Sequence, residues 1–168
     1  MQGDEISILA AAVEVERFGF DLYTAMNECV KDPNGSALLR GLARDEAEHR
    51  RILEREILRL SPQAELRSLK PAEEYLGIVP DQVFPGDLGE RCSTLQGEIE
   101  AVEIGIKVEK RSIWMYTDAT GKVKDEKLKD LLEYLARWEG THKKALEENL
   151  HMLKTGGSWY GYSPILEG

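Results

Sequence analysis

Hydrophobic residues recur at intervals of three and four along four separate stretches of the chain. This spacing places them on one face of a helix, as in the contact faces of a helical bundle. We therefore predict helices near residues 4–30, 34–60, 92–120 and 126–154. Each apolar stripe also contains an acidic residue at its middle, and two stripes contain a histidine. Buried faces rarely carry such residues without a reason.

The residues at the predicted helix ends support these boundaries. Asp32-Pro33 reads as a capping aspartate followed by proline at the first helical position. Asp125 occupies the corresponding position before the fourth helix, and Gly156-Gly157 is expected to end that helix.

Residues 61–91 separate the two helical pairs and contain four of the six prolines, so they cannot form one long helix. A connection of this length allows the second and third helices to run parallel, as in ferritin-like bundles. We expect a short helical turn near 72–76 and packing of this crossover against the bundle through Tyr75, Leu76, Ile78, Val79 and Phe84. The aromatic tail, residues 155–168, is expected to dock on the bundle surface or on a second subunit.

The second half of the chain repeats the first with an offset of 93 residues. Residues 15–60 align with 108–153 without a gap, and 17 of the 46 aligned positions are identical. The repeat includes the polar residues of the apolar stripes. Each half supplies one Glu from its first helix and a Glu-x-x-His pair from its second: Glu16, Glu46 and His49 in the first half, and Glu109, Glu139 and His142 in the second. We predict an all-α, single-domain four-helix bundle made of two hairpins, 4–60 and 92–154.

The cost of burying charge favours a metal site over a solvated helix face or a purely structural repeat. A buried carboxylate without a partner costs several kcal/mol. Glu and His at i, i+3 share one helix face, so each pair can grip one ion while the other glutamates bridge. Carboxylate and imidazole ligands without thiolate suit iron or manganese, with zinc as a common substitute. A lone Glu-x-x-His is usually a solvated face, and a repeat alone could be structural, but neither explains an acid on each of the four apolar stripes.

Three further residues have both a functional and a structural interpretation. Tyr23 and Tyr116 lie two turns beyond the first Glu of each half, and they are either simple core residues or hydrogen-bond donors to a ligand carboxylate. Asp45, just before Glu46, is either a surface acid beside Arg44 or an acceptor for the free ring N–H of His142. The repeat carries Trp138 at the corresponding position, which cannot accept a hydrogen bond.

Composition excludes several classes of partner. The net charge of −9 argues against nucleic acid and anionic membranes as partners. No apolar run is long enough to span a bilayer, and no signal peptide is evident. Cys29 and Cys92 form no C-x-x-C pair, so we expect inert thiols and a cytoplasmic protein.

With these motifs, the chain resembles the ferritin-like di-iron carboxylate superfamily, and within it the rubrerythrin branch. The resemblance rests on Glu16-x6-Tyr23, Glu46-x-x-His49 and their repeat copies, and covers about two-thirds of the chain. It implies two iron ions, with manganese or zinc possible, a reaction with peroxide or dioxygen, and a homodimer. The rubredoxin module of rubrerythrins, with its two C-x-x-C pairs, is absent here, so the resemblance implies a separate electron-donor protein.

A second departure concerns the ligand set. Rubrerythrins carry an additional Glu three residues from the third-helix ligand, whereas Ile106 and Ser112 flank Glu109 here, and Glu103 is off its face. The set of four Glu and two His resembles that of bacterioferritin-type centres. Three functions therefore remain open at this point: a di-iron oxidoreductase, a ferroxidase or iron-storage protein, and a non-catalytic metal-binding bundle.

Overall fold

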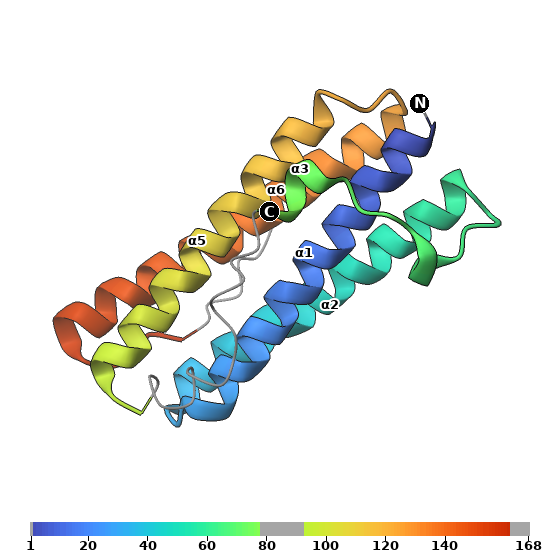
Figure 1. Ribbon diagram of the computed structural model, residues 1–168. Helices are drawn as coiled ribbons and strands as arrows, with labels where there is room; N and C mark the ends of the chain where they lie inside the picture. The colour runs from blue at the N-terminus through green and yellow to red at the C-terminus, as the bar shows by residue number, and fades with distance from the viewer. Residues whose placement is uncertain (1, 78–92, 162–168) are drawn as a thin grey trace.

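The computed structural model describes residues 2–77 and 93–161. Within them the chain forms four long helices arranged as two antiparallel hairpins (Figure 1). The first hairpin comprises α1, Gln2–Cys29, and α2, Pro33–Leu60; the second comprises α5, Leu95–Thr120, and α6, Glu126–Gly156. These bounds differ from the predicted ones by three residues at most. The described part of the chain contains no strand, and the predicted all-α, ferritin-like bundle is confirmed.

The two hairpins pack side by side, so that each long helix has two neighbours. Within the hairpins α1 packs on α2 and α5 on α6, and between them α1 contacts α5 and α2 contacts α6. The parallel course of α2 and α5 is visible in Figure 1, where both helices run upward from the same end of the bundle. This parallel course of α2 and α5 is the arrangement that the length of the connection between them predicted.

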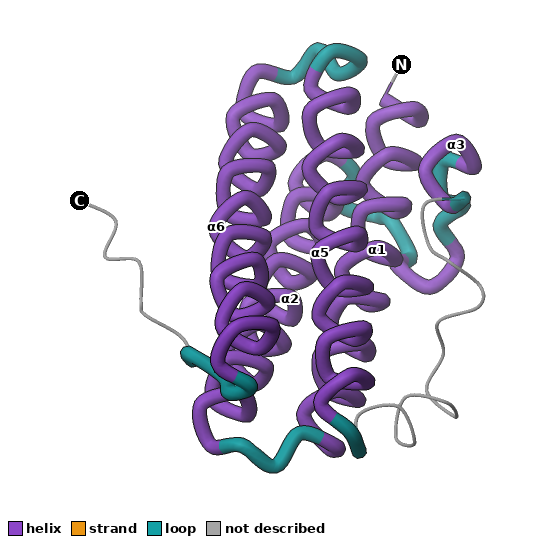
Figure 2. Tube along the Cα trace, turned by 90° about the vertical axis from the view of Figure 1, so that its left-hand side faces the viewer, coloured by secondary structure: helices purple, strands orange, loops and turns teal. Residues whose placement is uncertain are grey.

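The described part of the crossover packs against the bundle near the N-terminus of α1. It contains a short 3₁₀ helix, Leu66–Ser68, and the predicted helical turn, which is α3, Glu73–Leu76. Figure 2 shows α3 beside α1. Tyr75 on α3 is fully buried, and its hydroxyl donates to Asp118 Oδ2 at 2.7 Å. The packing expected of Ile78, Val79 and Phe84 lies outside the described residues.

The predicted capping residues form the N-caps of α2 and α6. The Asp32 carboxylate accepts hydrogen bonds from two backbone N–H groups of α2, and Asp125 accepts one from Leu128 of α6. Each such cap is worth about 1 kcal/mol. At the other end of α6, Gly157 adopts a left-handed conformation with φ of 70°, which a residue with a side chain would resist.

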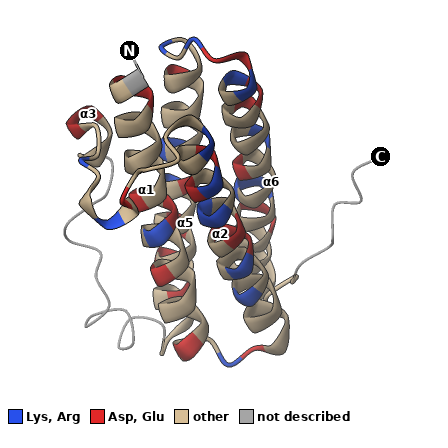
Figure 3. Ribbon diagram, turned by 90° about the vertical axis from the view of Figure 1, so that its right-hand side faces the viewer, with Lys and Arg blue, Asp and Glu red and all other residues tan. Residues whose placement is uncertain are grey.

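The core consists of two apolar clusters, one toward each end of the bundle. One cluster contains Phe18, Leu22, Met26, Leu39, Val102 and Leu146, and the other contains Leu9, Leu53, Ile57, Met115, Leu132 and Leu135. Buried polar residues from all four long helices lie in the layer between the two clusters. The other lysine, arginine, aspartate and glutamate residues of the described chain, whose positions along the helices are coloured in Figure 3, are at least partly exposed.

The beginning of the tail docks on its own bundle. Trp159 is buried, its ring lies against Gly35, and its indole N–H donates to Glu98 at 3.0 Å. A Cβ atom at Gly35 would lie 2.7 Å from the Trp159 ring, so α2 must carry glycine here for the tail to fit. Asn149 holds the backbone of Tyr160 and Gly161 through hydrogen bonds of 2.8–2.9 Å.

Two remaining expectations concern the cysteines and membranes. Cys29 is disulfide-bonded, so the prediction of an inert thiol is wrong for this residue. Sequence spacing could not reveal the bond, because the pairing of distant cysteines depends on the fold. Cys92 lies outside the described residues. Among the described helices, none is sufficiently long and apolar to cross a bilayer.

Candidate metal centre

The six predicted ligands meet in the polar layer between the two apolar clusters. Their residues are between 0% and 3% exposed to solvent. Their ligand atoms form two overlapping groups, each with all atoms within 4.8 Å of one another. The first group is Glu16, Glu46, His49 and Glu139, and the second is Glu46, Glu109, Glu139 and His142. Glu46 and Glu139 belong to both groups, so they lie where bridging ligands would lie between two ions.

Both imidazoles present the same ring nitrogen to the carboxylates. His49 Nδ1 lies 3.0 Å from Glu139 Oε1 and 3.4 Å from Glu16 Oε2. His142 Nδ1 lies 3.0 Å from Glu139 Oε2 and 3.1 Å from Glu46 Oε1. The two rings are stacked with centroids 5.6 Å apart. Two nitrogen donors and four carboxylates therefore converge from opposite hairpins.

Each tyrosine holds a glutamate of the opposite hairpin. The Tyr23 hydroxyl, from α1, donates to Glu109 Oε1 on α5, and the Tyr116 hydroxyl, from α5, donates to Glu16 Oε1 on α1. Burial, followed by the charge of the bonded glutamate, raises the pKa of both tyrosines well above the ordinary value. Both hydroxyls therefore remain protonated and act as donors that fix the two non-shared carboxylates.

Without a metal, this cluster must retain protons. Burial, together with the charges of neighbouring glutamates, raises the pKa of Glu46 and Glu139 well above the usual range. Burial alone would also raise the pKa of Glu16, but contacts with Glu46 and His49 outweigh it and lower that pKa to about 2. Burial opposes the charged form of His49, yet its glutamate neighbours raise its pKa to about 10.

The donor set fits a pair of hard or borderline cations. Glu16 Oε2 is buried and makes no hydrogen bond, and its contact with His49 Nδ1 is long, at 3.4 Å, so a cation would satisfy it better. Carboxylate oxygens and imidazole nitrogens without a thiolate suit iron, manganese or zinc. Neither Ile106 nor Ser112, three residues on either side of Glu109, offers a carboxylate, and the Ser112 hydroxyl donates to the carbonyl of Val108 in its own helix. Glu103 lies toward the outside and pairs with Lys154 at 3.1 Å.

The structure also places Asp45 where the repeat suggested. Asp45 Oδ2 lies 3.1 Å from His142 Nε2, the ring nitrogen that faces away from the carboxylates. Burial opposes ionisation of Asp45, but its hydrogen bond with His142 lowers the pKa of the carboxyl below the ordinary value. Asp45 is thus part of the centre and not a solvated surface acid.

Sequence reasoning missed the part that glycines play in the centre. A Cβ atom at Gly19 on α1 would lie 3.1 Å from Glu46 Cδ, and one at Gly105 on α5 would lie 3.3 Å from the Tyr23 ring. The absence of a side chain at both glycines therefore leaves room for Glu46 and Tyr23. Glycine inside a long helix costs about 0.5–1 kcal/mol relative to alanine, and that anomaly is the signal which could have drawn attention to them.

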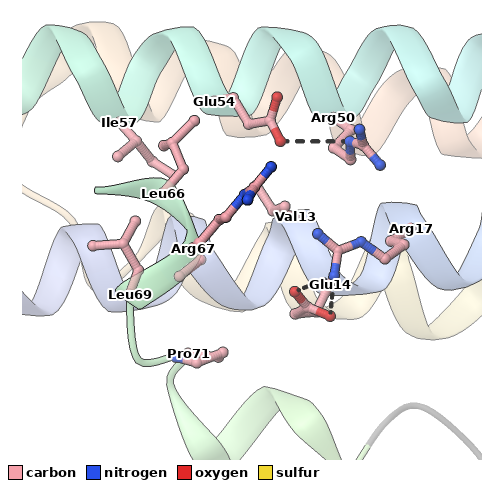
Figure 4. A pocket seen from close by; sticks show the side chains of 11 residues that line it. Val13, Glu14, Arg17, Arg50, Glu54, Ile57, Leu66, Arg67, Leu69 and Pro71 are labelled. Carbon is pink, nitrogen blue, oxygen red and sulfur yellow. Dashed lines mark hydrogen bonds and ion pairs between the residues drawn. The ribbon is translucent and has the colours of Figure 1, made fainter. Parts of the chain in front are cut away.

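A separate cavity of about 370 Å³ lies between α1, α2 and the crossover (Figure 4). It is lined by three arginines and two glutamates over an apolar floor, and Arg17 and Arg50 adjoin Glu16 and His49 in sequence. None of the six predicted ligands lines this cavity. The candidate metal centre, whose six residues are at most 3% exposed, is therefore separate from this pocket.

A four-helix bundle with a central carboxylate–histidine cluster defines the ferritin-like class. The sequence profile of the rubrerythrin family matches residues 7–150, so the chain belongs to the rubrerythrin family. Among solved structures, a hypothetical protein from Pyrococcus furiosus is similar in fold, with 20% sequence identity, coverage of 90% of this chain and 91% of that one, and a TM-score of 0.71. No curated protein matches the chain significantly.

Proposed function

We propose that the protein is a non-haem di-iron oxidoreductase that reduces peroxide or dioxygen with electrons from a separate donor protein. The observation that carries the proposal is the enclosed cluster of four glutamates and two histidines in a chain of the rubrerythrin family. Glu16 and His49 would hold one ion, Glu109 and His142 the other, and Glu46 and Glu139 would be shared.

Bound iron would supply one electron from each of two ions, which with two protons reduces hydrogen peroxide to two molecules of water. The residues of the chain prepare the site for that chemistry. Tyr23 and Tyr116 hold the non-shared glutamates in place from the opposite hairpin. The apolar clusters on either side exclude bulk water, which strengthens the electrostatic interactions inside the layer.

Metal binding and proton retention compete for the same atoms. Burial and neighbouring charges raise the pKa of the two shared glutamates, and carboxylate neighbours raise the pKa of both histidines, so protons and cations compete for these atoms. Cations must displace these protons to bind. The same groups are therefore suited to take up protons whenever the positive charge in the centre falls.

A ferroxidase or iron-handling function is the second candidate. The observation that favours it is that neither Ile106 nor Ser112, three residues on either side of Glu109, is a glutamate. The centre is consequently a symmetric set of four Glu and two His. Storage requires a large cage, whereas the oxidoreductase function needs only the homodimer that we expect.

Stopped-flow mixing of the anaerobic ferrous protein with peroxide and with dioxygen tests the proposal. We expect close to two irons per chain, and faster oxidation by at least one of these oxidants than for free ferrous ion in the same buffer. His142→Ala should lose metal, and His151→Ala, which removes the exposed histidine of the same helix, should keep it. A 24-subunit assembly by light scattering would favour storage, and a protein that binds less than one metal per chain would refute both functions.

A further inference from the structure

The two halves of the centre have the same proposed ligands, one Glu and one Glu-x-x-His pair each. They differ in the residue that contacts each histidine ring on the side away from the carboxylates. At the repeat position just before the Glu-x-x-His pair, α2 carries Asp45 and α6 carries Trp138. Because α2 and α6 are neighbours, the residue before one pair faces the histidine of the other helix. The environment of each histidine is therefore set by the opposite half of the repeat.

His142 is held on both sides of its ring. Its Nδ1 faces the carboxylates, while its Nε2 lies 3.1 Å from Asp45 Oδ2. Asp45 is only 9% exposed, and its contact with Arg44 is long, at 3.8 Å, with the Arg44 side chain 76% exposed. An exposed pair of that kind contributes little. The main partner of the Asp45 carboxylate is thus His142.

His49 is held on one side only. Its Nδ1 faces the carboxylates in the same way, but its buried Nε2 has no hydrogen-bond partner. Trp138 occupies the space instead, with its ring edge-on to the imidazole at a centroid distance of 5.0 Å. An indole can only donate, and this one donates to Asp45 Oδ2 at 3.4 Å. Trp138 therefore leaves His49 without an acceptor and adds a second donor to Asp45.

A carboxylate that accepts the second N–H of a ligating histidine fixes the ring, selects its tautomer and raises its basicity. We propose that Asp45 makes the Glu109–His142 position the tighter of two unequal metal positions, so that the first ion enters there and the second enters the Glu16–His49 position. Asp45 acts as a positioning residue for His142. Trp138 maintains the inequality because its ring lies against His49 and offers that histidine no acceptor. The inference rests on the proposed two-metal function and deepens it.

Titration of the chelator-stripped full chain with Mn²⁺, followed by calorimetry, measures the inequality directly. Loss of such a carboxylate partner typically costs 10–100-fold in metal affinity, so we expect two steps whose dissociation constants differ by about that factor. Asp45→Asn, which keeps the shape and removes the charge, should weaken the tighter step about tenfold and leave the weaker step unchanged. Asp130→Asn removes an exposed charge of α6 and should alter neither step.

A second variant separates the two roles of the indole. Trp138→Phe keeps a ring against His49 and removes only the N–H that donates to Asp45. It should preserve the two unequal steps and their order. If Trp138→Phe equalises the steps, the inequality arises from the indole N–H and the proposal is overturned.

The position of the first ion provides a readout that a general loss of stability would not change. Crystals grown with one equivalent of Mn²⁺ should show anomalous density beside His142, and Asp45→Asn should divide that density between both positions. Density mainly beside His49, two equal steps in the wild type, or identical titrations for Asp45→Asn and the wild type would each overturn the inference while leaving the proposed function intact. Failure to bind about two ions would overturn both.

Discussion

Removal of the metal should destabilise the fold, and the size of the effect follows from the enclosed cluster. Four glutamates and two histidines are at most 3% exposed, and Glu16 Oε2 has no hydrogen-bond partner. Unfolding separates these ligands, so ions bind the native state preferentially. At a free metal concentration 100 times the dissociation constant, each position adds about 2.7 kcal/mol, or about 5 kcal/mol for two. For a chain of this size, the melting temperature should rise by about 10–20 °C.

Differential scanning calorimetry in excess Mn²⁺ and in chelator measures this shift, with elemental analysis of the same samples. His142→Ala should lose most of the shift because it removes one nitrogen donor from the cluster. His151→Ala should retain it, since that side chain is exposed and lies outside the cluster. If the loaded and stripped wild-type proteins melt within about 2 °C of each other at saturating metal, the buried acids are not metal ligands and the reasoning fails.

Three further predictions concern the tyrosine, the histidine charge and the glycine. Tyr23→Phe removes a donor to a buried carboxylate, so it should keep metal but lower stability by about 1–3 kcal/mol and change the oxidation rate in stopped flow; wild-type behaviour in both would make the tyrosine simple core. The pKa of His49 is raised from 6.5 to about 10, so its stabilisation of the metal-free fold is full below pH 6.5 and lost as pH rises through 10; a melting temperature in chelator that stays constant from pH 6.5 to 10 would contradict this. Gly19→Ala places a Cβ 3.1 Å from Glu46 Cδ, so it should reduce the metal-dependent gain in melting temperature, whereas Gly41→Ala, with open space around it, should leave that gain unchanged.

The sequence by itself predicted the helices, the repeat and the six polar residues that the structure brings together. Helical periodicity is local, so an apolar stripe specifies which residues share a face before any partner helix is known. The exact offset of 93 residues then related Glu16 to Glu109 and His49 to His142. The caps Asp32 and Asp125 could also be assigned, because a cap depends on backbone groups only two or three residues away.

Only the tertiary structure decided which atoms meet. Tyr23 donates to Glu109 and Tyr116 to Glu16, although each tyrosine lies on the same helix as the other glutamate. That exchange depends on how closely α1 and α5 approach, and a stripe on one helix contains no information about the distance to its neighbour. The space at Gly19 for Glu46 was hidden for the same reason.

The disulfide at Cys29 and the docking of Trp159 on Gly35 likewise join residues that no local pattern connects. The difference between the two histidines depends on both the sequence and the tertiary structure. The substitution of Trp138 for Asp45 in the repeat is written in the sequence, but the unpartnered Nε2 of His49 appears only when α2 and α6 are packed together. Sequence periodicity determines what each helix presents, and side-chain packing between helices determines which of those groups find partners.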